Sequence, residues 1–165
     1  MSEATDKPLG APSPQAGRAI IDREACLGMT MQCADFNLRR ATRRVSQAFD
    51  QALKPTGLKI TQFSLLVACH LNENLVLSKL ARVMGMDRTT LSRNLALLEK
   101  RGLVALERGD DRREVRAQLT PAGLAALDQA APLWHQAQER IVAGVGDGKW
   151  QAMLADLRQL IRGLR

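Results

Sequence analysis

Apolar residues recur at helical spacing along most of the chain, which predicts a mainly helical protein. Between residues 34 and 53 they lie four and three positions apart, the pattern of a long amphipathic helix that Pro55 and Gly57 end. The run at 62–71 is apolar on most sides and predicts a buried second helix, capped by Thr61. Residues 77–84 predict a short third helix.

The stretch "GMDRTTLSRNLALLEKRG", residues 85–102, predicts a turn followed by a fourth helix. Gly85 suits the left-handed conformation that ends a helix, and Asp87 is a favourable N-cap for the next one. Leu91, Leu95 and Leu98 fall on one side of this helix. A short helix, a glycine-containing turn and a second helix make a helix-turn-helix.

Beyond Gly102, two short alternating segments, "LVALER" and "REVRAQLT", predict a β-hairpin with a charged tip. Thr120 then caps a further helix with Pro121 at its first position. Pro132 is expected to bend or break that helix. Glycines at 144, 146 and 148 interrupt the chain, and Asp147 is expected to cap a last helix with a wide apolar face.

These elements predict a mainly α fold with a small β-hairpin wing, a winged helix-turn-helix joined to a helical dimerisation domain. Residues 1–22, rich in Pro, Gly, Ser and Ala, read as a flexible tail. The winged helix-turn-helix takes residues 61–119. Residues 23–60 and 120–165 form the dimerisation domain, because the last helix has little else in the chain to cover its apolar face.

Charge narrows the class of partner. The formal net charge is +7 and the isoelectric point of the chain is high, which favours a polyanion, double-stranded DNA before an anionic membrane. Aromatic residues make up only 3% and tyrosine is absent, which disfavours binding by base stacking. The sequence has neither a signal peptide nor an apolar run long enough to span a bilayer, so a cytoplasmic protein with no membrane partner is expected.

The polar side of the fourth helix has the composition of a DNA-reading surface. Thr89 and Arg93 lie opposite the leucines, with Thr90 and Ser92 on the flanks. Arginine contacts phosphates or grips guanine with two hydrogen bonds, and short hydroxyl side chains let the backbone approach the DNA. At the hairpin tip, arginines surround Asp110 and Asp111, which favours an arginine directed into a minor groove.

The segments "ITQFSLL", "LSKLARVMGMDRTTLSRNLALLEKRGLV" and "DDRREVRAQLTPAG" resemble the MarR family of winged-helix transcriptional regulators. The resemblance implies a homodimer, in most cases a repressor released by a small molecule such as an aromatic carboxylate or a phenol. It implies that Asp111 orients Arg113 in the wing. The DNA-binding residues that it implies are Arg88, Thr89, Thr90, Ser92, Arg93, Arg112 and Arg113.

An effector pocket is expected where the long first helix, the second helix and the helix after the hairpin meet the DNA-binding lobe. Its candidate residues are Arg39, Arg40, Arg43 and His70. One branch of the family senses peroxides with a cysteine near the start of the first helix, where Cys33 lies, so a thiol-based redox sensor is an alternative.

Other chemistries find little support. The two histidines and three cysteines show no metal-ligand spacing, and no catalytic set or cofactor motif is evident, so an enzyme is not expected. Two non-DNA functions stay open on the sequence alone: a helical module whose basic face docks an acidic protein, and a membrane-surface protein. The shallow alanine stripe of the first helix disfavours the membrane-surface protein.

Overall fold

The computed structural model describes residues 22–72, 75–108 and 115–164 of the chain. The chain divides into two compact units, residues 1–41 and 42–165, and each is described by itself. The first unit contains helix α1 (Arg23–Gln32) and the beginning of helix α2 (Ala34–Leu53). The sequence pattern had not indicated a separate α1. Asp22 caps this helix by accepting a 2.8 Å hydrogen bond from the Ala25 amide, and none of its residues is buried.

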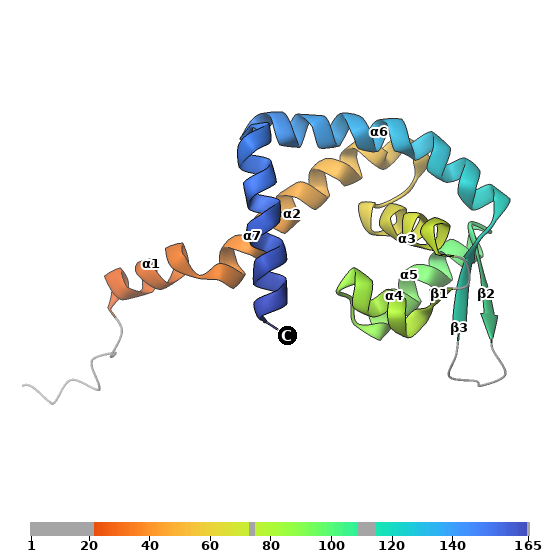
Figure 1. Cartoon of the computed structure of the whole chain (residues 1–165), viewed down its shortest axis with the longest axis horizontal. Coiled ribbons are helices and arrows are strands. Elements are labelled where there is room, and N and C mark those ends of the chain that lie inside the picture. Colours follow the sequence, from red (N-terminus) through yellow and green to blue (C-terminus); the bar gives the residue numbers. More distant parts are fainter. Residues whose placement is uncertain (1–21, 73–74, 109–114, 165) are drawn as a thin grey trace, which may run out of the picture. The chain divides into compact units, whose positions relative to one another are not determined.

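The second unit begins within α2 and contains the remaining elements. They are, in chain order, η1 (Lys54–Thr56), α3 (Ile60–Leu71), β1 (Leu75–Val76), α4 (Leu77–Met84), α5 (Arg88–Lys100), β2 (Val104–Arg108), β3 (Val115–Leu119), α6 (Pro121–Val145) and α7 (Asp147–Gly163). Figure 1 shows α3 between α6 and the pair formed by α4 and α5, with the sheet at one end of this lobe. The predicted fold class, mainly helical with a hairpin wing, is confirmed.

The sheet has one strand more than the predicted hairpin. Its order is β1-β3-β2, and both pairings are antiparallel. Leu75 of β1 pairs with Ala117 of β3, and Val104 of β2 pairs with Leu119. A two-residue strand is too short to leave a periodic pattern, so only its pairing with β3 reveals it.

The core is aliphatic, as a chain with few aromatic residues requires. Leucines from α3, α4 and α5 fill its centre, and the Leu65, Leu80 and Leu95 side chains are fully buried. Three of the five aromatic residues gather at one place. Trp134 of α6 stacks with Phe49 of α2 and with Phe63 of α3, at 6.0 Å between ring centroids in each case. This stack holds α6 against both helices.

The start of α3 differs from the sequence-based prediction. Thr61 does not cap the helix, because α3 begins one residue earlier, at Ile60. The free amides of the first turn find acceptors elsewhere. The Ile60 amide donates to the Asp50 carboxylate of α2 at 2.8 Å, and the Lys59 amide donates to the Gln62 side chain at 3.1 Å. A carboxylate ten positions away in the chain therefore replaces the expected hydroxyl cap.

Pro132 does not break α6, which runs unbroken from Pro121 to Val145. Proline removes one backbone hydrogen bond. Buried Leu127 and Ala130 before it and Ala137 after it hold the helix on the core, so the loss is tolerated.

The turn between α6 and α7 also differs from the prediction. The helix break falls at Gly146 alone, where φ is +91°, while Gly144 and Gly148 lie within helices. Gly146 is the N-cap residue of α7, and Asp147, the expected cap, is the first helical residue. None of the described residues of α7 is buried. Trp150, Leu154 and Leu157 are half-buried, whereas Leu160 and Ile161 are exposed, so the apolar face is only partly covered within this chain.

Candidate nucleic-acid interface

The turn between α4 and α5 has the geometry predicted for a helix-turn-helix. Gly85 adopts the left-handed conformation, with φ +60°, and the Met86 amide donates to the Ala81 carbonyl oxygen at 2.9 Å. Val76 provides no side-chain cap at the start of α4, because the valine side chain has no hydrogen-bonding group. Asp87 caps α5 by accepting a 2.8 Å hydrogen bond from the Thr90 amide. Glycine and aspartate together set the angle between the two helices.

Helix α5 divides into a buried and an exposed side. Leu91, Leu95 and Leu98 have no exposed surface, which fixes the rotation of the helix about its axis. As a consequence, the polar residues of its first two turns face solvent. These exposed side chains are Arg88, Thr89, Ser92 and Arg93, with Thr90 beside the cap. The arrangement presents two guanidinium groups and two hydroxyl groups on the N-terminal half of the second helix, the part that enters a major groove.

Thr90 has a role in the cap that the sequence did not show. Its hydroxyl donates a 2.7 Å hydrogen bond to the second oxygen of the Asp87 carboxylate. This bond is the largest cause of a lowered pKa of Asp87, and the hydrogen bond from the Thr90 amide is the next largest. The Thr90 hydroxyl therefore contributes to the cap, and its predicted contact with DNA stays a prediction.

The C-terminal end of α5 is attached to two other parts of the second unit. Arg101, just beyond the helix, donates to the carbonyl oxygens of Gly57 at 3.0 Å and Thr56 at 3.3 Å. The Thr120 hydroxyl donates to the Gly102 carbonyl oxygen at 2.6 Å, and the Thr120 amide donates to that of Leu103 at 3.2 Å. The sequence pattern indicates no role for Arg101. A basic residue directly before a helix-ending glycine was the signal available, and it does not identify the acceptors.

The wing consists of β2 and β3, whose connection lies outside the described residues. Asp111, Arg112 and Arg113, the predicted wing contacts, belong to that connection, so their placement stays a prediction. The described part of the hairpin is anchored at its base, where Ala117 is fully buried between β1 and β2. The Gln118 side chain donates to the Glu107 carboxylate across the strands at 3.1 Å.

The four candidate effector residues fall in both units. Arg39 and Arg40 lie in the first unit, whereas Arg43 and His70 lie in the second. His70, at the end of α3, lines a cavity of about 510 Å³, and Arg43 is not among the residues that line it. Arg39 binds the Asp35 carboxylate at 2.9 Å, which raises the pKa of Arg39.

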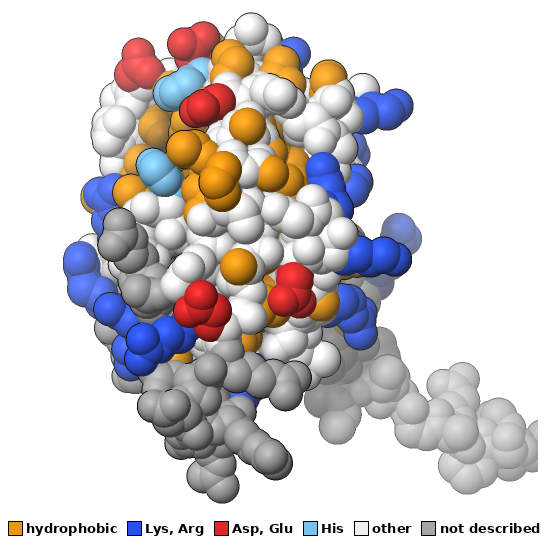
Figure 2. Space-filling model, turned by 90° about the vertical axis from the view of Figure 1, so that its right-hand side faces the viewer, with side chains coloured by type: hydrophobic (Ala, Val, Ile, Leu, Met, Phe, Trp, Pro, Cys, Tyr) orange, Lys and Arg blue, Asp and Glu red, His pale blue; other side chains and the backbone are white. Residues whose placement is uncertain are grey.

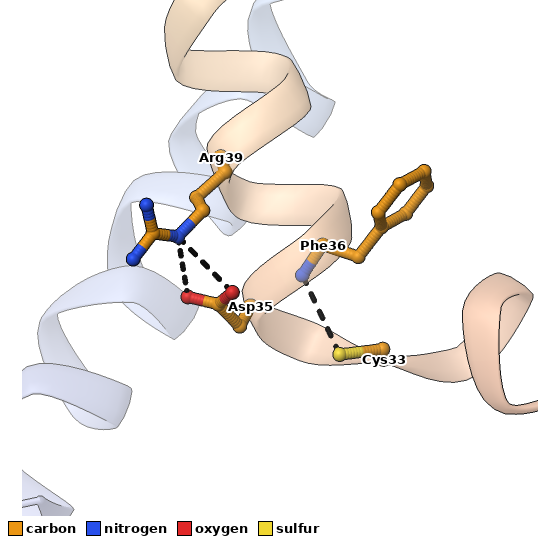
Figure 3. A network of polar contacts seen from close by, with 4 residues as sticks. All are labelled: Cys33, Asp35, Phe36 and Arg39. Carbon is orange, nitrogen blue, oxygen red and sulfur yellow. Dashed lines mark hydrogen bonds and ion pairs between the residues drawn. The ribbon is translucent and has the colours of Figure 1, made fainter.

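Cys33 lies at the junction of α1 and α2 and is exposed. Figure 3 shows its sulfur at the first turn of α2, where it accepts a hydrogen bond from the Phe36 amide at 3.5 Å. Cys26 is also exposed, whereas Cys69 is buried in α3. Burial raises the pKa of the Cys69 thiol to about 11.

Two features of the described ranges bear on other functions. In residues 22–72, 75–108 and 115–164, no three histidine, cysteine or carboxylate side chains lie close enough to hold a metal ion. Within the same ranges, none of the helices is long and apolar enough to cross a bilayer.

A helix-turn-helix followed by a β-hairpin defines a winged helix-turn-helix DNA-binding protein. Residues 56–114 match the sequence model of the MarR family. Over 125 residues the chain is 30% identical to the transcriptional repressor NicR of Pseudomonas putida. The aligned residues make up 75% of this chain and 79% of NicR. The chain belongs to the MarR family of transcriptional regulators.

Solved structures of transcriptional regulators have the same fold as this chain. The transcriptional regulator MosR of M. tuberculosis is 41% identical, with a TM-score of 0.72 over 81% of this chain and 98% of MosR. MosR in complex with DNA gives 42% identity and a TM-score of 0.71 over 81% of this chain and 99% of MosR. CouR from Rhodococcus jostii, bound to p-coumaroyl-CoA, is 27% identical, with a TM-score of 0.68 over 79% of this chain and 92% of CouR.

Proposed function

We propose that the protein is a homodimeric transcriptional repressor that binds a pseudo-palindromic operator and is released by a small-molecule effector. The observation that carries the proposal is the two-sided character of α5. Three fully buried leucines hold the helix to the core, and its N-terminal half exposes Arg88, Thr89, Ser92 and Arg93. In a helix-turn-helix, that half of the second helix contacts base edges.

The dimer is supported by the apolar surface of α7, which this chain covers only in part. No described residue of this helix is buried, and Ile161 is 60% exposed. Isolated exposed apolar residues are common, but an apolar face along a whole helix marks an interface. A second copy of the chain is the partner that fits, because a two-fold axis would also place two α5 helices in successive major grooves.

Repression and release by a ligand are supported by the relatives. NicR is a transcriptional repressor, MosR has been solved with DNA, and CouR has been solved with p-coumaroyl-CoA. A ligand releases DNA only if it binds the DNA-free form more tightly than the DNA-bound form.

The test is fluorescence anisotropy with DNA from upstream of the protein's own gene, against a scrambled duplex of equal length at one fixed salt concentration. We expect about 1000-fold tighter binding to the upstream DNA, with two chains bound per duplex by light scattering. Equal affinity for both duplexes would contradict sequence-specific repression at that site. Binding by a single chain would contradict the dimer.

Cys33 supports a second candidate, control by thiol oxidation in the same fold. Its exposed sulfur accepts a hydrogen bond from the Phe36 amide at the first turn of α2 and is open to an oxidant from solvent. Attack of the thiolate on hydrogen peroxide would form an S–O bond, break the O–O bond and release hydroxide. Peroxide should then weaken DNA binding in the wild type, and dithiothreitol should restore it. The same response in Cys33→Ser would exclude this role for Cys33.

A further inference from the structure

The second unit contains a cavity on the DNA-binding lobe, away from the exposed face of α5. It lies where the end of α3, the end of β3 and the first turn of α6 meet, and its volume is about 510 Å³. This is within the range of small-molecule sites in proteins. The residues that line it are Cys69, His70, Gln118, Leu119, Thr120, Pro121 and Leu124. Figure 2 shows an apolar area bordered by histidine on the face of the molecule at the sheet end.

The lining combines apolar walls with a few neutral polar groups. Leu119, Pro121 and Leu124 provide apolar surface, and Cys69, 3% exposed, lies deepest in the core. Because burial raises the pKa of this thiol to about 11, its sulfur is uncharged at neutral pH. Among the described residues that line the cavity there is no lysine, arginine, aspartate or glutamate. The His70 imidazole, exposed on α3, offers ring nitrogens as hydrogen-bonding groups.

We propose that this cavity binds a small uncharged molecule with an apolar body and at least one hydrogen-bonding group, such as an aromatic amide. The apolar body would pack on Leu119 and Leu124, and its polar group would bond to His70. A carboxylate fits less well, because an anion next to apolar walls needs a cationic partner that the described lining does not supply. The inference gives the effector of the proposed function a location and a chemical class, and its regulatory part rests on that function.

The cavity wall is also the joint between the wing and α6. Thr120, one of its lining residues, donates to the carbonyl oxygens of Gly102 and Leu103, directly after α5. Thr120 also accepts the Gly123 amide at 3.0 Å and so caps α6. A ligand between α3 and this joint contacts the segment that connects the DNA-reading helix to α6. It therefore has a direct route to favour one orientation of α6 relative to α5.

The binding test is a ¹H–¹⁵N NMR titration of the full chain with benzamide, and with benzoate as the anion of matched shape. We expect benzamide to shift the amide signals of Cys69, Leu119 and Leu124, with a dissociation constant on the order of 1 mM. Benzoate should bind at least several-fold more weakly. Absence of shifts at the lining, or tighter binding of benzoate, would overturn the proposal.

Two substitutions on the same turn of α6 provide the matched pair. Leu124→Trp fills the cavity, whereas Ala125→Trp places an indole on an exposed position that does not line it. Benzamide shifts should vanish in the first variant and persist in the second. If Leu124→Trp does not fold, His70→Trp fills the cavity from its rim. Benzamide shifts that persist in a folded filled variant would show that the probe binds elsewhere.

The regulatory part is measured separately, by DNA anisotropy on the same samples. We expect saturating benzamide to change the affinity of the wild type for its operator by about fivefold or more, and to have no effect on Leu124→Trp. Benzamide binding without a change in DNA affinity would contradict the regulatory role, whereas the binding site itself would stand. Loss of operator preference without any probe would instead count against the proposed function, and the NMR result would stand.

Discussion

The Arg101 guanidinium donates a 3.0 Å hydrogen bond to the carbonyl oxygen of Gly57, 44 positions earlier in the chain. Arg101 follows α5, and Gly57 ends the turn after α2. On the other side, the Thr120 hydroxyl holds the Gly102 carbonyl oxygen at 2.6 Å. The end of α5 is therefore bound to the segment that follows α2 and to the segment that leads into α6. We expect a change in the orientation of either helix to reach α5 through these two attachments.

The role of Arg101 as a positioning residue can be separated from a phosphate contact. Arg101→Ala removes the attachment to Thr56 and Gly57, so we expect operator affinity to fall by about tenfold while its salt dependence is unchanged. A phosphate contact would instead lower the slope of log affinity against log salt by about 1. Arg140→Ala, an exposed arginine of α6, controls for the lost charge. A reduced slope in Arg101→Ala would contradict the positioning role.

Substitutions at the exposed face of α5 should affect specificity. Arg93→Ala is expected to reduce operator affinity by about tenfold or more and to reduce discrimination between operator and scrambled DNA. Arg112→Ala or Arg113→Ala, in the wing, should weaken binding to both duplexes alike. Anisotropy with both duplexes measures each case. Wild-type affinity and discrimination in Arg93→Ala would rule out this face of α5 as the reading surface.

Gly123 occupies a position in α6 that leaves no room for a side chain. A Cβ there would overlap the Leu103 carbonyl oxygen and lie 2.7 Å from Leu119 Cδ1. Gly123→Ala should therefore lower the free energy of unfolding by roughly 3 kcal/mol, measured by chemical denaturation. Gly144→Ala is the matched control in the same helix, because nothing lies within 4 Å of its added Cβ. That substitution should stabilise the protein by up to about 1 kcal/mol, and equal effects would contradict the packing argument.

The cap of α3 gives a stability test between two residues. Asp50→Ala removes the acceptor of the Ile60 amide and should cost about 1 kcal/mol of unfolding free energy. Thr61→Ala changes a residue inside the helix, and we expect an effect below about 0.5 kcal/mol. Thermal or denaturant unfolding of both variants decides the matter. A larger loss of unfolding free energy in Thr61→Ala than in Asp50→Ala would show that Thr61 caps the helix.

Cys69 should make stability sensitive to alkaline pH. Burial raises the pKa of its folded-state thiol to about 11, from an ordinary value of 9.0. The folded protein therefore holds this proton more tightly than the unfolded chain does. The resulting stability is fully present below pH 9.0 and is lost as the pH rises toward about 11.

The measurement is denaturant unfolding between pH 8 and 11. The wild type should lose more stability over this window than Cys69→Ala. That variant lacks the Cys69 thiol and keeps every other titrating group. Tyrosine, which titrates in the same range, is absent from the chain. Parallel pH profiles in the two proteins would show that the Cys69 thiol does not contribute.

Local sequence patterns determined the elements around the DNA-reading helix. The leucine spacing placed α5 and its buried side correctly, and the Gly85 turn and the Asp87 and Thr120 caps were all confirmed. Each of these features depends on residues within a few positions of one another. Hydrophobic periodicity and capping preferences act over that distance, so the sequence by itself determines them.

Tertiary structure decided what depends on distant parts of the chain. Asp50 replaces Thr61 at the start of α3, and strand β1 exists only through its pairing with β3. The core on both sides of Pro132 keeps α6 continuous. Likewise, the Arg101 attachment and the cavity beside His70 join segments tens of residues apart. No local preference encodes such contacts, because they arise only when packing of the core brings the segments together.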